Sequence, residues 1–95
     1  MSKDLIEKIK SVLINKPVQK AYLFGSTART DDTSDSDVDI LVELDYSKPI
    51  GLEFIKMKLQ LEDILKREVD LLTTKSISKY IQSFIDQEKV LIYEK

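Results

Sequence analysis

The pattern of apolar and polar residues along this chain predicts helices and strands in alternation. In some segments apolar side chains recur every three or four residues, as in amphipathic helices, and in others they form short runs, as in buried strands. The predicted helices are residues 3–15, a short helix at 26–31, residues 51–66 and a segment starting at Ser76; the predicted strands are residues 18–24, 37–44 and 68–73. Residues 90–93 form either a last short strand or an extended tail. The alternation predicts an α+β fold, a small sheet of three to four strands covered by helices.

Each long helix is expected to bury one apolar face. Ser2 is the expected N-cap of the first helix, which ends before Pro17. The side chains predicted to point inward are Leu5, Ile9, Val12 and Leu13 from the first helix, Leu52, Ile55, Leu59, Leu61, Ile64 and Leu65 from the second long helix, and Ile77, Tyr80, Ile81, Phe84 and Ile85 from the last. An alternative is that Tyr46, Phe54, Met57 and Tyr80 are partly exposed and offer a surface to a partner, although Phe54 and Tyr80 fit a core position better.

Length and composition narrow the chemistry that is open to this chain. Its 95 residues have room for one domain, residues 1–95. Cysteine and histidine are both absent, which excludes disulfides, thiolate metal sites and imidazole catalysis. No apolar run is long enough for a membrane span and the N-terminus lacks a signal-peptide pattern, so we expect a cytoplasmic protein with no membrane partner. Any catalysis has to use carboxylates, hydroxyls, Lys or Arg and a borrowed metal ion.

Charge is distributed unevenly along the chain. The formal net charge is −2, yet residues 31–45 contain seven acids and no base. An acidic run is often only a solvated loop, but this one leads directly into the apolar strand at 37–44. Carboxylates at the start of a buried strand repel one another, and a divalent cation would relieve that repulsion. Lys and Arg are scattered elsewhere without forming a block, so tight nucleic-acid binding is not expected.

Polar residues mark three predicted strands. Gly25-Ser26 follows the first strand, Asp37 and Asp39 open the second, and Asp70 interrupts the apolar third. Residues i and i+2 of a strand share a face, so Asp37 and Asp39 project together. Asp70 would be costly in a core unless it is satisfied, and it joins the other two acids if the third strand lies beside the second. Such a carboxylate set suits one or two Mg²⁺ ions about 3.5–4 Å apart.

The Gly25-Ser26 turn predicts a phosphate clamp beside those carboxylates. Gly25 allows the backbone to approach a ligand closely, and the amides after Ser26 open a helix N-terminus, which favours anions. The Ser26 hydroxyl can donate to a phosphate oxygen, and Arg29 lies one turn further on. A triphosphate held between this turn and carboxylate-bound Mg²⁺ is the ligand that the arrangement suits.

These residues resemble the minimal nucleotidyltransferases of the DNA polymerase β-like superfamily over almost the whole chain. The matching segments are Leu23-Phe24-Gly25-Ser26-Thr27-Ala28-Arg29, then ten residues between Ser26 and the Asp-x-Asp of Ser36-Asp37-Val38-Asp39-Ile40-Leu41-Val42, and Asp70 in a Val-Asp-Leu strand. Thr30 departs from the family, which often has Gly after Ala-Arg. The resemblance implies a nucleotidyltransferase fold with a small mixed sheet.

The resemblance also implies an activity. Many such proteins are antitoxins that neutralise a helical HEPN toxin, an RNase, by transferring AMP from ATP to a toxin tyrosine and by binding it in a hetero-oligomer. On that basis the site would hold two Mg²⁺ ions: Asp37 and Asp39 would hold Mg²⁺, and Asp70 would ligate the catalytic ion and help to deprotonate the acceptor. Gly25 and Ser26 would hold the β- and γ-phosphates.

Rival functions fit the residues less well. A non-catalytic antitoxin of the same fold that acts by occlusion, or an enzyme that modifies a small molecule such as an aminoglycoside, remains open. The complete carboxylate set favours catalysis, because a pure binder has no need of Asp70. An EF-hand is disfavoured because Ile40 and Tyr46 occupy positions that require Gly and Glu, and no P-loop is present. The Asp-x-Asp of haloacid-dehalogenase phosphatases follows an apolar strand, whereas here it precedes one.

Overall fold

Four strands form one sheet in the part of the chain that the computed structural model describes, residues 3–28 and 37–95. The elements in chain order are α1 (Lys3–Leu13), β1 (Val18–Leu23), the 3-10 turn η1 (Gly25–Ala28), β2 (Val38–Leu44), α2 (Glu53–Leu65), β3 (Val69–Thr73), α3 (Lys79–Glu88) and β4 (Val90–Glu94). The α+β architecture and the positions of the predicted strands are therefore confirmed, and residues 90–93 belong to a strand rather than to a tail.

The sheet is mixed, with the strand order β3-β2-β1-β4. β1 pairs antiparallel with both β2 and β4, whereas β2 and β3 are parallel and are connected through α2. A parallel pair needs a crossover of this kind, and the helix between the strands provides it. The topology brings the end of β1 and the beginnings of β2, β3 and β4 to the same end of the sheet.

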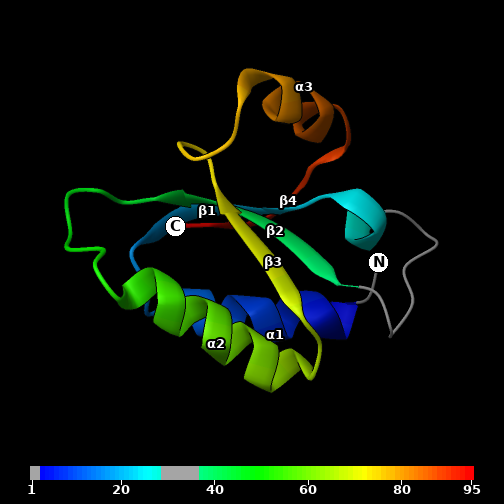
Figure 1. Ribbon diagram of the computed structural model, residues 1–95. Helices are drawn as coiled ribbons and strands as arrows, with labels where there is room; N and C mark the ends of the chain where they lie inside the picture. Colours follow the sequence, from blue (N-terminus) through cyan, green and yellow to red (C-terminus); the bar gives the residue numbers. More distant parts are fainter. Residues whose placement is uncertain (1–2, 29–36) are drawn as a thin grey trace.

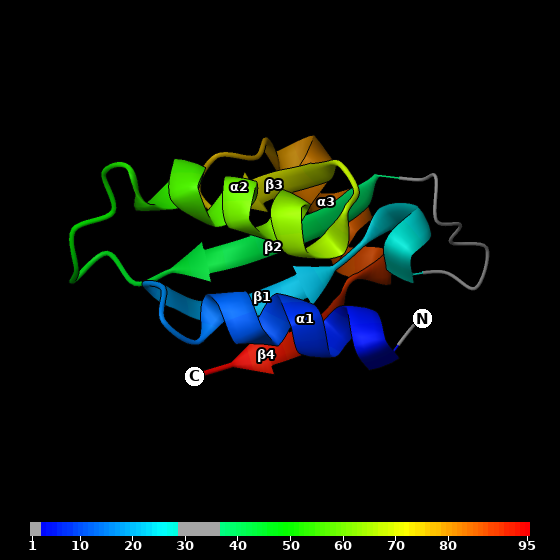
Figure 2. The ribbon, with the colours of Figure 1, turned by 90° about the horizontal axis from the view of Figure 1, so that it is seen from below.

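The main core lies between one face of the sheet and the pair α1 and α2. Figure 2 shows these two helices running side by side across that face, and Figure 1 shows α3 on the other side. The completely buried side chains of this core include Ile9, Leu13, Val18, Ala21, Leu23, Val38, Ile40, Val42, Met57 and Leu61. None of the described helices is both long enough and apolar enough to cross a membrane.

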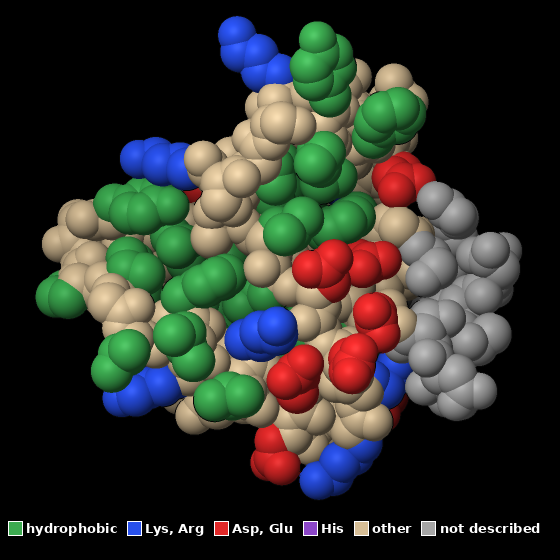
Figure 3. All heavy atoms as spheres, in the orientation of Figure 1, with side chains coloured by type: hydrophobic (Ala, Val, Ile, Leu, Met, Phe, Trp, Pro, Cys, Tyr) green, Lys and Arg blue, Asp and Glu red, His purple; other side chains and the backbone are tan. Residues whose placement is uncertain are grey.

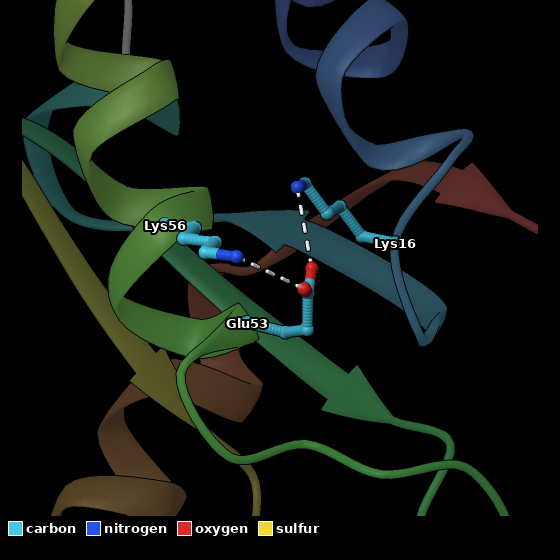
Figure 4. Close-up of polar contacts among 3 residues, drawn as sticks. All are labelled: Lys16, Glu53 and Lys56. Atoms are coloured by element: carbon cyan, nitrogen blue, oxygen red, sulfur yellow. Dashed lines mark hydrogen bonds and ion pairs between the residues drawn. The ribbon is translucent and has the colours of Figure 1, made fainter.

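A polar contact ties the turn after α1 to the first turn of α2 (Figure 4). The Nζ of Lys16 lies 3.4 Å from Oε2 of Glu53, and the Nζ of Lys56 lies 3.9 Å from Oε1 of the same carboxylate. The Lys16 side chain is only 11% exposed, so this ion pair is shielded from solvent more than an ordinary surface pair. It supports the two helices on the same face of the sheet.

The predicted inward face of α2 is wrong for three leading residues. Leu52, Ile55 and Leu59 are 68%, 57% and 59% exposed. Leu61 and Leu65 are buried as predicted, and the third buried residue of the helix is Met57. At about 100° per residue the two sets lie on opposite sides of one helix. Only one stripe can face the sheet. Met57, weighed from the sequence as partly exposed, is completely buried, whereas Phe54 is half-buried against the core.

The predicted inward face of α3 is also wrong, except for one residue. Ile85 is buried, whereas Tyr80 is 85%, Phe84 72% and Ile81 48% exposed. Ile77 is half-buried and lies before the helix. The most extensive contacts of α3 with another element are with η1 rather than with the strands, so little of the helix is covered.

The starts of two predicted helices shift for local reasons. The Ser76 hydroxyl donates to the carbonyl of Thr73 over 3.1 Å and closes a turn there, while the Ser78 side chain accepts from the amide of Ile81 over 3.2 Å and caps α3. The short helix predicted at 26–31 is a 3-10 turn over its described part, Gly25–Ala28. The rest of that range and the predicted cap Ser2 lie outside the described residues.

Candidate active site

The end of the sheet where β2, β3 and β4 begin collects the predicted site residues. Gly25 is the second residue after the end of β1, and Asp39 and Asp70 are the second residues of β2 and β3. Acidic side chains gather on this part of the surface in Figure 3. We call Gly25, Asp37, Asp39 and Asp70 the acidic edge.

Asp39 and Asp70 are direct partners on adjacent strands. The parallel register of β2 and β3 places Asp39 opposite Asp70, one position after the pair Val38 and Val69. Both valines are buried in the core, so strand alternation directs both carboxylates to the opposite face. Asp39 is half-buried and Asp70 is exposed. The prediction that the third strand lies beside the second and adds Asp70 to Asp39 is confirmed for this pair.

Asp37 lies just before β2 and is exposed. Its carbonyl accepts a hydrogen bond from the Thr27 hydroxyl over 3.4 Å, and the same hydroxyl accepts one from the Asp39 amide over 2.9 Å. Thr27 is completely buried, so these bonds fasten η1 to the start of β2. Sequence reasoning missed Thr27. In the sequence, Thr27 looks like an ordinary turn residue, because its hydrogen bonds to the start of β2 form only when the chain is folded.

Gly25 lies directly against the Asp39 carboxylate. Its φ is +62°, a conformation that glycine adopts readily and other residues rarely do. A Cβ at this position would overlap Oδ2 of Asp39, and the neighbouring Phe24 amide donates to the Asp39 carbonyl over 3.2 Å. The group that lies close to the Gly25 backbone in the structure is thus the Asp39 carboxylate, and the predicted close approach to a ligand stays a prediction.

Glu88 brings a further carboxylate to the same place. It is the last residue of α3, and its Oε1 accepts a hydrogen bond from the Gly25 amide over 3.0 Å. Sequence reasoning missed Glu88 because it reads as the polar end of a helix. The signal that could have found it is the final strand: if β4 pairs antiparallel with β1, the residues before β4 return to the end of β1.

A cation also lies on the face of the sheet opposite the main core. Lys89 Nζ is 2.9 Å from Asp86 Oδ1 and 4.5 Å from the centre of the Tyr22 ring. The hydrogen bond to Asp86 is the main reason that the pKa of Lys89 is raised above its usual value.

Two predicted phosphate ligands stay predictions. Ser26 lies within η1, next to Gly25, as the motif requires. Arg29 lies outside the described residues. The proposed phosphate contacts of these two side chains thus depend on the sequence motif.

The acidic edge has the donor chemistry that Mg²⁺ requires. Among residues 3–28 and 37–95, no three acidic side chains are close enough to form a complete metal cage. Mg²⁺ prefers oxygen ligands and is usually held by one or two carboxylates together with waters and substrate phosphates. The paired Asp39 and Asp70, with the backbone of Gly25 packed directly against the Asp39 carboxylate, fit that mode of binding. The mixed sheet and this edge together define a nucleotidyltransferase type of domain.

Comparisons with known proteins agree with that class. The family model described as Polymerase beta, Nucleotidyltransferase matches residues 7–95. A Methanocaldococcus jannaschii relative, provisionally named a protein adenylyltransferase, is 38% identical over 87 residues, which cover 92% of each chain. Protein adenylyltransferase MntA of Thermococcus cleftensis is 33% identical over 95 residues, covering 92% of this chain and 95% of that protein. The chain belongs to the polymerase β-type nucleotidyltransferase family.

Solved structures share the fold. A chain of a toxin–antitoxin complex with AMP-PNP superimposes with a TM-score of 0.79 at 23% identity, covering 95% of this chain and 73% of that chain. A chain from the complex of tri-AMPylated Shewanella oneidensis HEPN toxin with MNT antitoxin gives a TM-score of 0.75 at 22% identity, covering 100% of this chain and 74% of that one. At these identities the likeness establishes the arrangement of strands and helices.

Proposed function

We propose that this protein transfers AMP from ATP to a hydroxyl group of a partner protein, a tyrosine of a HEPN-type toxin, and thereby acts as its antitoxin. The observation that carries the proposal is the pairing of Asp39 with Asp70 on adjacent strands, with Gly25 against the Asp39 carboxylate. The names of the relatives and of the structural neighbours support AMP as the group transferred and a HEPN toxin as the acceptor. We place the reaction in the cytoplasm, where ATP is available.

Different residues of this chain would bind the ATP donor and the metal ion next to the acceptor hydroxyl. Asp37 and Asp39 would hold the Mg²⁺ of the nucleotide, and Asp70 would share a second ion with Asp39. When bound, Mg²⁺ supplies positive charge that stabilises the phosphoryl oxygens during transfer. The η1 turn would hold the triphosphate through Ser26, with Gly25 allowing the ligand to approach the backbone closely, and Arg29, which follows η1 in the sequence, would add a positive charge. The buried Thr27 fixes η1 to β2.

The reaction is an in-line displacement. The acceptor oxygen attacks the α-phosphorus of ATP and forms a phosphodiester with AMP, while the bond to the β-phosphate oxygen breaks and pyrophosphate leaves. The proton of the acceptor hydroxyl passes to the Asp70 carboxylate. Asp70 suits this role because it is the exposed member of the pair and can be reached by an incoming hydroxyl.

Asp70→Asn tests the proposal most sharply. The variant should bind ATP within a few-fold of wild type but transfer AMP at least about 10²-fold more slowly, because it loses a positioned proton acceptor. The measurement is the intact mass of a HEPN-type partner after incubation with saturating ATP and Mg²⁺. Asp63→Asn is the matched control, since Asp63 is exposed on α2 and pairs only with the surface Lys66 in the described contacts.

The same assay separates the alternatives. Tight partner binding without any mass increase for wild type would favour a module that acts by occlusion. Equal modification by wild type and Asp70→Asn would remove Asp70 from the mechanism. Transfer to an aminoglycoside-like hydroxyl compound, and none to protein, would make a small molecule the acceptor.

A further inference from the structure

The C-terminal end of α3 is joined to the glycine turn of the acidic edge. The Glu88 carboxylate accepts the Gly25 amide over 3.0 Å, although 63 residues separate the two in sequence. Glu88 is half-buried, and the helix that carries it makes its most extensive contacts with η1. This bond is therefore part of the way that α3 is seated, rather than a chance meeting of surface groups.

Gly25 is held between two carboxylates. The Glu88 carboxylate accepts a hydrogen bond from the Gly25 amide, and the Asp39 carboxylate occupies the space that a Cβ on Gly25 would need. Because Gly25 has no Cβ, its backbone is freer to rotate than that of another residue, and outside contacts are needed to keep it at its φ of +62°. Thr27 fixes the far part of η1 to β2, whereas Glu88 fixes its first residue.

We propose that Glu88 is a positioning residue of the nucleotide site, which sets the Gly25 turn at the correct distance from Asp39 through its hydrogen bond to the Gly25 amide. This inference rests on the proposed function, because the ligand that the turn receives is the triphosphate. Glu88 acts through Gly25. The seating of α3 and the affinity for nucleotide are consequently linked.

The nature of the bond determines which property of Glu88 matters. Its donor is a neutral backbone amide, so an uncharged side-chain oxygen with the same reach can accept it. A carboxylate that ligated a cation would instead need its charge. Glu88→Gln keeps the reach and loses the charge, whereas Glu88→Asp keeps the charge and is one methylene shorter. The two variants therefore separate positioning from metal binding.

The first experiment measures ATP affinity in the presence of Mg²⁺ by calorimetry. Glu88→Ala and Glu88→Asp should each weaken binding roughly five- to tenfold, the effect expected for losing one ordinary hydrogen bond, and Glu88→Gln should restore most of the affinity. In the AMP-transfer assay the loss should appear in the KM for ATP rather than in kcat. Asp86→Asn is the matched control. It removes a charge from the same turn of α3, but the Asp86 carboxylate pairs with Lys89 and not with the Gly25 amide.

A second readout does not depend on nucleotide. The amide proton of Gly25, followed by nuclear magnetic resonance, should exchange with solvent slowly in wild type and in Glu88→Gln, and several-fold faster in Glu88→Asp. If wild type shows the protected amide but binds no ATP, the proposed function fails while the structural contact stands. Wild-type ATP affinity in Glu88→Asp would overturn the inference. A larger loss of affinity in Glu88→Gln than in Glu88→Asp would also overturn it, since Glu88 would then act through its charge.

Discussion

Single residues at the acidic edge are constrained by their immediate neighbours. Gly25 is the strongest case, because its positive φ and the adjacent Asp39 carboxylate both exclude a side chain. The buried Thr27 is a second case, since its hydroxyl accepts a hydrogen bond from the Asp39 amide. These constraints belong to the site and not to the main core, which lies on the other face of the sheet.

Gly25→Ala should impair both folding and nucleotide binding. The added methyl group must displace the Asp39 carboxylate or force the turn out of its conformation, and a residue strained in this way costs on the order of 1–3 kcal/mol. Urea unfolding should show a loss of stability of that size, and ATP binding should be weakened even at temperatures where the variant is folded. Wild-type stability together with wild-type affinity would contradict the geometry at Gly25.

The opposite end of β2 offers a prediction about pH. The Ser47 hydroxyl and amide both donate to the Asp45 carboxylate, over 2.5 and 3.1 Å, and hold the pKa of Asp45 below its usual value. A carboxyl group with a lowered folded-state pKa stabilises the protein above its unfolded pKa, and this contribution is lost as the pH falls through the folded pKa. Ser47→Ala should raise the pKa of Asp45 towards the ordinary value, as followed by nuclear magnetic resonance titration. An unchanged titration would mean that the Ser47 hydroxyl has no effect on Asp45.

At the level of elements, α2 carries apolar side chains on two opposite sides. The sequence pattern predicts a buried helix but cannot decide which of the two stripes faces the sheet, because Leu52, Ile55 and Leu59 are as regular as Met57, Leu61 and Leu65. The choice follows from packing against α1 and β3, which are distant in sequence. For α3 the periodicity correctly predicts a helix, but most of the residues predicted to be buried are exposed. The reason is that α3 packs mainly against the short η1 and not against the sheet.

A pair of substitutions in α2 tests this orientation. Met57→Ala removes a completely buried side chain and should lower the free energy of unfolding by about 2–5 kcal/mol. Leu59→Ala, two residues away on the exposed side, should change it by about 0.5 kcal/mol or less. Chemical denaturation of both variants measures the difference. Equal losses, or a larger loss for Leu59→Ala, would reverse the orientation of the helix.

For the whole molecule, the site residues that can be predicted from the sequence are those that lie at the ends of predicted strands. Asp37, Asp39 and Asp70 could be proposed as site residues because an acid next to an apolar strand stands out locally, and Gly25 because it follows a strand. Thr27 and Glu88 could not, because their roles appear only when η1 folds onto β2 and when β4 pairs antiparallel with β1. The antiparallel return of β4 carries the end of α3 to a turn that lies more than sixty residues earlier in the chain.

The central claim is that this edge of the sheet binds a nucleoside triphosphate through carboxylate-held Mg²⁺. The most direct measurement is a calorimetric titration of ATP into wild type and Asp39→Asn, each with Mg²⁺ and with EDTA, using Asp63→Asn as the control. We expect wild type and Asp63→Asn to bind ATP in Mg²⁺, and either EDTA or Asp39→Asn to weaken binding by about tenfold or more, the effect of losing a charge-assisted contact. ATP affinity that is the same with and without Mg²⁺, and the same in Asp39→Asn as in wild type, would contradict the account.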